Sequence, residues 1–410
     1  MLLKRISTSI NYINLLSCLF LTASSLYYTK FQQIGFYVFF ISYFIEIFTD
    51  KKWKNIKFDK DKIYYLALLL FFLLIFIYHP FENSNKYFYR LVELRLALFG
   101  FAGVGFLGVN KLYKVSYFAN TFIVSSVTAM MYIILGIGIT EFISNPQRAN
   151  LVSLFRVEHI NSHIVFNSYL NITLVCCWYL ISRTKTRFNA LRILFYVLST
   201  IPIIYFLIIS EGRVGIAVCI ILLFTISVYQ LWKIHKLSVV VFLIISPFLI
   251  WPIISNHQRM SKGEILNDPR AFIWKASIDV VKKQPLIGYG ASRAQEEFDA
   301  TLLNYETKEF KEYWKDIKIM HSHNQFVQTY MEFGIIGIIL LLGLIIGPIY
   351  LTEPKRRFFA IMLFFVFVSQ FMTDIVITYQ GFPVIFGILT LMTVAVKKEP
   401  SQQEQKLPAL

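Results

Sequence analysis

The sequence predicts an all-α integral membrane protein of about twelve transmembrane helices. Hydrophobic residues make up 56% of the 410-residue chain and charged residues only 16%, whereas a soluble domain carries roughly 25% charged residues. The hydrophobic residues gather in runs of about 20, the length that crosses the hydrocarbon core of a bilayer. These observations argue against a cytosolic enzyme, a disordered chain and a disulfide-bonded scaffold.

Twelve apolar runs are candidate spans. They lie near residues 8–27, 32–49, 63–79, 91–109, 116–137, 164–182, 191–210, 214–232, 237–255, 334–352, 358–376 and 379–396. The first run lacks the short apolar core and small-residue cleavage site of a signal peptide, so we interpret it as a span. Spans one to nine then occupy 1–255, and spans ten to twelve occupy 325–396, ahead of a cytoplasmic tail at 397–410.

Basic residues distinguish the two sides of this predicted bundle. One set of connections contains Lys4, Arg5, the lysine-rich segment 51–62, Lys111, Lys114, Arg183, Lys185, Arg187, Arg192, Lys233, Lys236, Lys355, Arg356, Arg357, Lys397 and Lys398. The opposite short connections contain only Lys30, Lys86, Arg90, Arg148, Arg156 and Arg213. Cytoplasmic loops are enriched in Lys and Arg. We therefore expect both termini in the cytoplasm, and we attribute the net charge of +16 to these loops rather than to nucleic-acid binding.

The polar segment 256–324 is the long connection on the outer side, which we expect to form a partly helical cap over the bundle. Asp268 and Pro269 suit a helix start. The residues at i, i+4 and i+7 that follow, Trp274, Ile278 and Val281, predict its apolar stripe.

Further signals in the same loop predict a turn and two more helices. Residues 286–290, Leu-Ile-Gly-Tyr-Gly, are typical of a tight turn. Ser292 with Gln295 resembles a capping box for a second helix. A third, charged helix is expected over 306–318.

Three arginines on the outer side are candidates for binding an anion. Arg270 lies in the first turn of a predicted helix, where backbone N–H groups and a guanidinium can converge on an anion. Arg213 is the only basic residue in its connection, and Arg259 lies near the start of the long loop. The alternatives are an exposed Arg270, and an Arg213 that extends to the membrane surface or pairs with Glu211.

The segment MHSHNQF contains His321, His323 and Asn324. Two histidines in an H-x-H pattern can bind a metal, but no acidic or cysteine partner lies nearby at ligand spacing, so we expect no metal site. A histidine near the outer surface can act as a general base, because its pKa is ordinarily near 6.5. The alternative is a hydrogen-bonded surface histidine.

Two charged residues near the fourth predicted span would be costly to bury. These are Glu93 and Arg95. An ion pair between Glu93 and Arg90, three residues apart, is the interpretation we prefer.

The outer arginines and His323 together suggest transfer from an activated, lipid-linked donor. No GxxxxGK[ST] phosphate-binding loop occurs in the sequence, and ATP is absent outside the inner membrane. A lipid-linked diphosphate sugar needs neither ATP nor a metal if arginines neutralise the diphosphate. His323 would then deprotonate an acceptor hydroxyl, and no cofactor is expected.

Residues 321–342, HSHNQFVQTYMEFGIIGIILLL, resemble the signature of the bacterial O-antigen ligase family. O-antigen polymerases and some protein O-oligosaccharyltransferases share this signature. In it a His-Asn pair, here His323-Asn324, precedes a span with Glu-x-Gly, here Glu332 and Gly334, and Gly-x-x-Gly, here Gly334 and Gly337.

Two further stretches are similar to the same family. Arg270 with Trp274 and the run 285–290 resembles its R…P-x-G-x-G segment. Ser210 to Arg213 fits its T/S-x-x-R context at the outer end of a span.

The resemblance implies an inner-membrane glycosyltransferase that moves O-antigen glycan from undecaprenyl diphosphate to lipid A–core, with inversion and without nucleotide or metal. His323 corresponds to the family's essential histidine, and Arg213 and Arg270 correspond to its essential arginines. Arg259 is a looser match, and His321 and Asn324 have supporting places.

Other functions stay open on the sequence. An O-antigen polymerase or a protein O-oligosaccharyltransferase would use the same donor with another acceptor. A transporter of lipid-linked glycan would also suit twelve spans, but no internal repeat is evident. The sequence indicates neither the glycan nor the oligomeric state.

Overall fold

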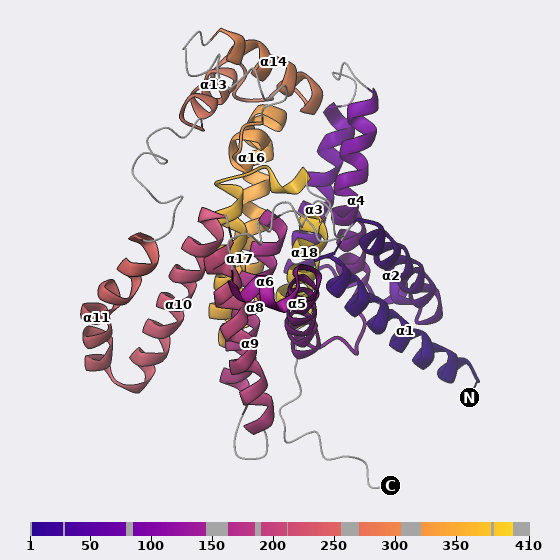
Figure 1. Cartoon of the computed structure of the whole chain (residues 1–410). Coiled ribbons are helices and arrows are strands. Elements are labelled where there is room, and N and C mark those ends of the chain that lie inside the picture. Colours follow the sequence, from indigo (N-terminus) through magenta and orange to yellow (C-terminus); the bar gives the residue numbers. More distant parts are fainter. Residues whose placement is uncertain are drawn as a thin grey trace.

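The computed structural model describes residues 2–27, 29–78, 85–144, 163–184, 190–210, 212–255, 270–304, 321–378 and 381–396. All the elements in these ranges are helices (Figure 1). This confirms the all-α class that the composition predicted.

The helices follow one another in this order: α1 (Leu2–Ser24), α2 (Thr29–Thr49), the 3-10 helix η1 (Lys52–Asn55), α3 (Lys60–Tyr78), α4 (Asn85–Leu107), α5 (Val115–Ile137), α6 (Ile139–Ser144), α8 (His163–Arg183), α9 (Ala190–Ile209), α10 (Arg213–Ile234), α11 (Lys236–Ser255), α13 (Arg270–Lys283), α14 (Ala291–Leu303), α16 (Gln325–Leu351), η5 (Pro354–Arg356), α17 (Arg357–Phe371), η6 (Val376–Thr378), α18 (Gly381–Thr390) and the π-helix η7 (Leu391–Ala395).

Every one of the twelve predicted spans contains a helix, and the described residues of these helices can be compared with the length and apolar character that crossing a membrane requires. Eight described helices meet that standard by length and composition, namely α1, α2, α3, α5, α8, α9, α10 and α16. The helices of the other four predicted spans, α4, α11, α17 and α18, are not among these eight in the part of the chain that the structure describes. A multi-pass membrane protein is therefore supported, and the number twelve stays a prediction.

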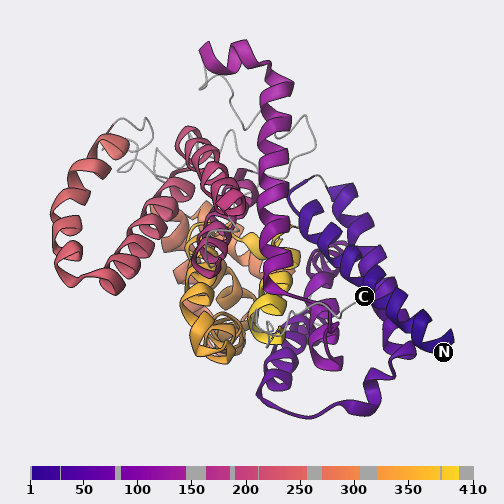
Figure 2. The same cartoon turned by 90° about the horizontal axis from the view of Figure 1, so that it is seen from below.

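Helices α13 and α14 lie across one end of the bundle and are called the cap below. Figure 1 shows α16 running from beneath the cap toward the opposite end of the bundle. The α10–α11 hairpin turns at that opposite end, so Arg213, the first residue of α10, lies on the cap side. Seen from below, α10–α11 and α1–α2 lie on opposite sides, with α16 and α18 between them (Figure 2).

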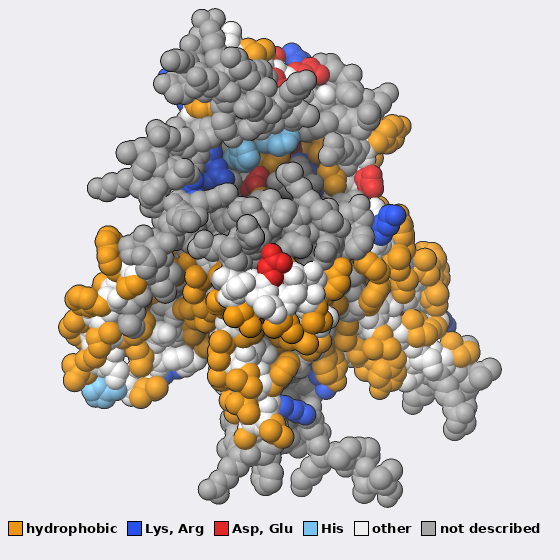
Figure 3. Space-filling view, viewed as in Figure 1, with side chains coloured by type: hydrophobic (Ala, Val, Ile, Leu, Met, Phe, Trp, Pro, Cys, Tyr) orange, Lys and Arg blue, Asp and Glu red, His pale blue; other side chains and the backbone are white. Residues whose placement is uncertain are grey.

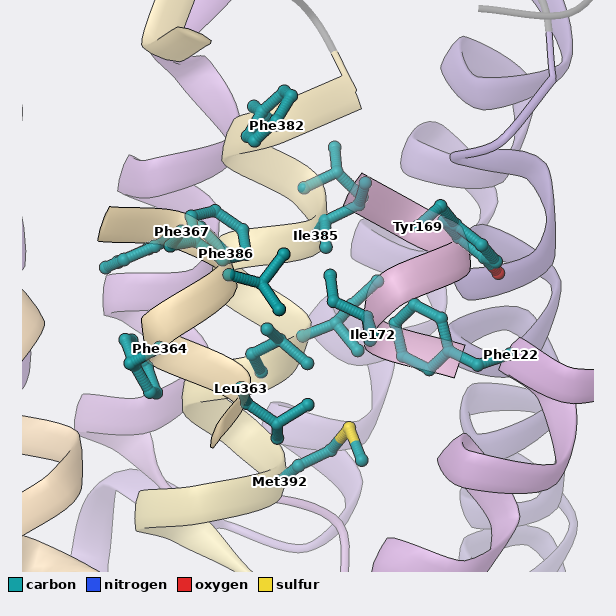
Figure 4. Close-up of a cluster of buried hydrophobic side chains, with 14 of the residues drawn as sticks. Phe122, Tyr169, Ile172, Leu363, Phe364, Phe367, Phe382, Ile385, Phe386 and Met392 are labelled. Atoms are coloured by element: carbon teal, nitrogen blue, oxygen red, sulfur yellow. The ribbon is translucent and has the colours of Figure 1, made fainter. Parts of the chain in front are cut away.

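The core of the bundle is built around α18. Figure 4 shows Ile385 and Phe386 of α18 between aromatic residues of α17 and the α8 residues Tyr169 and Ile172. Ile385, Tyr169 and Ile172 are fully buried. Lipid tails are as apolar as these side chains, so close packing rather than exclusion from water holds such helices together.

The cap helices form where the sequence predicted them, but two details of the prediction were wrong. Of the predicted stripe, Val281 packs against the cap core, but Trp274 and Ile278 are 38% and 47% exposed, whereas Ile273 and Val280 are buried in that core. The buried face is thus rotated by one residue from the predicted stripe, because α13 packs against α14 and α16 together.

The predicted capping box at the start of α14 is also absent. Gly290 is the N-cap and makes no side-chain cap hydrogen bond, and Gln295 donates instead to Asp299 (2.9 Å). A glycine fits this position because its φ is +78°. The predicted helix over 306–318, like Asp268 and Pro269, lies outside the described residues.

Helix α16 breaks at Gly334, where φ is 59° and ψ is −155°. The turn at 286–290 packs into the break through three backbone hydrogen bonds. Tyr289 N donates to Met331 O (2.9 Å), Gly290 N to Glu332 O (2.8 Å), and Ile335 N to Leu286 O (3.3 Å). Carbonyls that lose their helical partners at the break are therefore satisfied by the turn. This crossing attaches the cap to the bundle.

Replacing Gly334 should test the crossing, with Gly343 of the same helix as a matched control. A Cβ at Gly334 would lie 2.3 Å from Leu286 O, whereas one at Gly343 would meet nothing within 4 Å. Such a backbone conformation costs a non-glycine residue about 1–3 kcal/mol, before the clash is counted. We expect Gly334→Ala to lower the unfolding temperature in detergent, and Gly343→Ala to leave it unchanged or raise it. Equal unfolding temperatures would contradict this.

Candidate active site

His323 precedes α16 in a left-handed backbone conformation, with φ of 47°. Asn324 follows as the N-cap of α16, and its Oδ1 accepts from Val327 N (3.1 Å). An N-cap of this kind stabilises a helix by about 1 kcal/mol. Asn324 Nδ2 also donates to Met372 O (3.3 Å). Asn324, predicted as a supporting residue, therefore joins the start of α16 to the segment after α17.

That segment, residues 372–378, brings an acidic side chain to His323. The predicted span 358–376 was too long, because α17 ends at Phe371. The chain then turns, and Ile375 N donates to Asp374 Oδ1 (2.8 Å). Ile377 N donates to Gln325 Oε1 (3.0 Å), a second attachment to the first turn of α16. Asp374 is held between these two attachments.

Asp374 faces His323 across a short distance. His323 Nδ1 lies 3.6 Å from Asp374 Oδ1, just beyond hydrogen-bond distance, and the two side chains are 33% and 9% exposed. Burial alone would raise the pKa of Asp374. The facing imidazole, the Ile375 N–H and the charge of Arg270 outweigh burial and hold that pKa below its usual value. The Asp374 carboxylate is therefore ionised at neutral pH.

This pairing leaves one edge of the imidazole accessible. Nδ1 is buried and has no hydrogen-bond partner within 3.5 Å among the described residues. A carboxylate opposite Nδ1 favours the tautomer that carries its proton there, which leaves Nε2 able to accept a proton. A third of the side chain is exposed although Nδ1 is buried, so other atoms of the ring reach solvent. The arrangement suits a general base.

Arg270 lies in the first turn of α13, as the sequence predicted, and its charge acts on Asp374. The cap therefore brings Arg270 close to the His323–Asp374 pair. Arg270 and His323 are far apart in sequence, and the backbone crossing at Gly334 fixes the cap over the start of α16. A guanidinium beside a helix N-terminus can bind an anion at this place.

Arg213 begins α10 at the same end of the bundle and is partly exposed. Its position depends on α8, whose Asn167 packs against Gly212 and Gly215. Asn167 Nδ2 donates to Ser210 Oγ (2.6 Å), and Ser210 Oγ accepts from Gly212 N (3.3 Å). These contacts hold the short turn that presents Arg213 on the cap side.

A recess separates the cap from the bundle on this side of the molecule. Figure 3 shows histidine, basic and acidic side chains gathered within it, above a belt of hydrophobic residues. His321 is partly exposed, two positions before His323. Arg259, the third predicted arginine, lies outside the described residues. The recess is therefore polar.

Sequence reasoning missed Asp374, although a signal was available. An acidic residue in a predicted membrane span indicates a functional site by default, and Asp374 lies inside the predicted span 358–376. Spacing along the chain could not pair it with His323, since the two are brought together only by the turn after α17.

The comparisons with known proteins agree with the resemblance. Residues 197–342 match the sequence model of a family described as O-antigen ligase. The chain is 29% identical over 111 residues to a "Putative polysaccharide ligase" of Rickettsia conorii, covering 25% of the chain and 26% of that relative. Proteins of the same description from Rickettsia bellii (26% identity over 117 residues, 26% of the chain and 28% of the relative) and Rickettsia felis (28% over 111 residues, 25% and 26%) are also similar.

These matches are local, and the chain spans about a quarter of the length of the curated relatives it matches. The family match contains Arg213, Arg270, His323 and Asn324, as well as the turn at 285–290. It confirms the predicted resemblance to the O-antigen ligase family.

Acid should weaken the fold partly through Asp374. A carboxyl whose pKa is depressed in the folded state stabilises that state above its ordinary pKa of about 3.9, and this contribution is lost as the pH falls through the lower folded value. We expect Asp374→Asn to unfold at a lower temperature than the parent at pH 6, with the gap closing below about pH 4.

Asp279→Asn is the matched control for this measurement. Asp279 pairs with Lys282 on the cap surface at 3.3 Å, and an exposed pair contributes little. The control should therefore follow the parent at every pH. A gap between parent and Asp374→Asn that stayed constant from pH 7 to pH 3.5 would contradict the assignment.

Proposed function

Because residues 197–342 match the O-antigen ligase family, we propose that this protein transfers O-antigen glycan from undecaprenyl diphosphate to lipid A–core. The observation that carries the proposal is the contact of His323 with Asp374 (3.6 Å), within reach of the Arg270 charge. A base beside a cation, at the mouth of a membrane bundle, suits a lipid-linked anionic donor.

In the proposed orientation the recess faces the periplasm and the protein lies in the bacterial inner membrane. Both termini are then cytoplasmic, as the distribution of Lys and Arg favours. The isoprenoid part of the donor stays in the bilayer, and its diphosphate reaches the bundle end where Arg213 and Arg270 lie. Arg259 is a third candidate contact from the sequence.

The proposed reaction is a displacement at the anomeric carbon of the donor sugar. A hydroxyl oxygen of the acceptor forms the new bond to that carbon, and the bond between the carbon and the diphosphate oxygen breaks. His323 Nε2 takes the hydroxyl proton, and the diphosphate leaves with the bonding electron pair. Inversion at carbon follows from a single displacement.

Two kinds of stabilisation act in this step. Asp374 stabilises the imidazolium that forms on His323, and a positioned base contributes about 10²- to 10⁴-fold. The arginines neutralise the charge that develops on the departing diphosphate, for which a single donor is worth about 10²- to 10³-fold. In this scheme the side chains of the chain itself supply the proton transfer and the charge neutralisation.

Complementation tests the activity and the base together. The chain is expressed in a strain that lacks its own ligase but still makes lipid-linked O-antigen, and lipopolysaccharide is resolved on a gel. We expect a ladder with the parent, none with His323→Ala, and the parental ladder with His235→Ala, which alters an exposed histidine between α10 and α11.

The ligase-deficient strain, together with a polymerase-deficient one, separates the alternative mechanisms and acceptors. A ladder that survives in His323→Ala, at equal expression, would remove His323 from the mechanism. Rescue of a polymerase-deficient strain, with none in the ligase-deficient one, would replace lipid A–core by a growing glycan as acceptor.

The arginines should matter for the donor and not merely for charge on the cap. We expect Arg270→Ala to lower the rate of transfer from a purified lipid-linked donor at least about 10²-fold, and Arg270→Lys to recover only part of it, because lysine lacks the planar fork. Arg293→Ala, which changes an exposed cap arginine on α14, is the control and should retain the parental rate. Equal losses in both variants would show a general effect of cap charge.

A further inference from the structure

His323 is held in a backbone conformation that a histidine adopts rarely, and side chains on both sides of it keep it there. Asn324 holds the C-terminal side as the helix cap. On the other side, Ser322 is fully buried, and its Oγ lies 3.1 Å from Asn324 O and 3.0 Å from Gln328 Oε1. Such strain persists only where the surroundings over-determine it.

A chain of buried polar side chains continues from Ser322 into the bundle. Gln328 Nε2 donates to Glu332 Oε1 (3.0 Å), and Arg95 Nη2 donates to Glu332 Oε2 (2.9 Å). The three side chains are between 0% and 2% exposed. Arg95 belongs to α4, far from α16 in sequence, so the predicted pairing of charges near the fourth span missed this partner.

The ion pair at the buried end fixes which group donates and which accepts in each hydrogen bond of this series. A carboxylate can only accept, so the amide of Gln328 must turn its NH₂ group to Glu332 and its carbonyl oxygen to Ser322. A carbonyl oxygen can only accept, so the Ser322 hydroxyl shares its one proton between Gln328 Oε1 and Asn324 O. The polarity set by one ion pair is thus transmitted to the residue next to His323.

The pair is not arranged for stability alone. Arg95 Nε and Nη1 are buried without a hydrogen-bond partner among the described residues, and a buried ion pair is often no more stable than well-packed hydrophobic residues of the same size. A buried arginine with unused donors is better explained by the orientation that its hydrogen bond gives to the Glu332 carboxylate.

We propose that Arg95 and Glu332 are positioning residues, which act through Gln328 and Ser322 to hold His323 in its strained conformation opposite Asp374. They touch neither donor nor acceptor. The expected effect on the rate of glycan transfer rests on the proposed function. The expected effect on the conformation of His323 does not, and the experiment measures the two separately.

We call the hydrogen-bonded series Arg95, Glu332, Gln328 and Ser322 the relay, and three variants interrupt it at different points. Arg95→Met/Glu332→Met removes the ion pair without leaving a lone buried charge. Gln328→Leu removes the link, and Ser322→Ala removes the last hydroxyl. The matched control is Glu46→Met/Lys52→Met, because that pair (2.5 Å) is also largely buried but joins α2 to η1 and has no link to His323. Arg95→Lys is the conservative variant that keeps a cation beside Glu332.

The first readout needs no activity. Diethyl pyrocarbonate modifies histidines at rates that depend on their surroundings, and mass spectrometry of peptides follows His323 and His235 in the same sample. We expect all three relay variants to change the His323 rate several-fold and leave the exposed His235 unchanged. The control pair should change neither rate, and Arg95→Lys should lie nearer the parent than the relay variants do.

The second readout is transfer from the lipid-linked donor. Loss of a strained but productive conformation worth about 1.4 kcal/mol is about tenfold in rate, so we expect kcat to fall by about tenfold or more, with the donor KM within about twofold of the parent. Misplacement of the base, unlike loss of donor binding, lowers kcat alone.

The outcomes distinguish the inference from the proposed function. If folded relay variants keep the parental His323 rate, the positioning role is wrong, whatever the enzyme does. If the parent transfers glycan to no acceptor, the proposed function fails, and the modification rates still decide the inference. If the double variant does not fold, Ser322→Ala and Gln328→Leu decide it by the same two readouts.

Discussion

The backbone crossing between the turn at 286–290 and the break in α16 is the constraint on which the site depends. A Cβ on Gly288 would lie 2.5 Å from Gly334 N, and one on Gly334 would lie 2.3 Å from Leu286 O. The two backbone segments can approach this closely only because both positions are glycine. The approach fixes the cap, and with it Arg270, over the end of α16 that presents His323. The turn at 285–290 and the Glu-x-Gly stretch, separate in the sequence, therefore form the two sides of one contact.

The charged groups of the site lie at helix ends, for an electrostatic reason. An ionised side chain is costly in the middle of a bilayer, whereas the start of α16, the start of α13 and the turn after α17 meet at a polar recess. Asp374 stays ionised there because His323 and Arg270 offset its burial. Glu332, deeper in the bundle and fully buried, has Arg95 as its partner at 2.9 Å. These two carboxylates are therefore paired, Asp374 with a base and Glu332 with a cation.

Composition and spacing predicted the all-α membrane class, the two cap helices and the turn between them, because these follow from local signals. They predicted His323, Arg213 and Arg270 as candidates through residue type and the resemblance. They missed Asp374 and the pairing of Arg95 with Glu332, since Asp374 lies in the turn after α17 and Arg95 in α4. Pairing between elements that are distant in the sequence leaves no mark in the periodicity of one helix. The buried face of α13 was wrong for a related reason: two neighbouring helices decide it. The capping box predicted at Ser292 is absent because Gly290, whose positive φ suits glycine, occupies the N-cap position of α14.

The spacing between the His-Asn pair and the Glu-x-Gly stretch has a physical explanation in this chain. Gln328 and Glu332 are four residues apart on α16, so their side chains share a helix face and hydrogen-bond directly (3.0 Å). Gln328 also reaches back to Ser322 (3.0 Å) across the first turn of α16. Inserting one residue between Gln328 and Glu332 would rotate Glu332 about 100° around α16, away from Gln328 and Arg95. It would also shift the break at Gly334 away from the turn at 286–290. The same few residues thus hold His323, anchor the cap and pair the buried arginine, and a change of spacing would disturb all three.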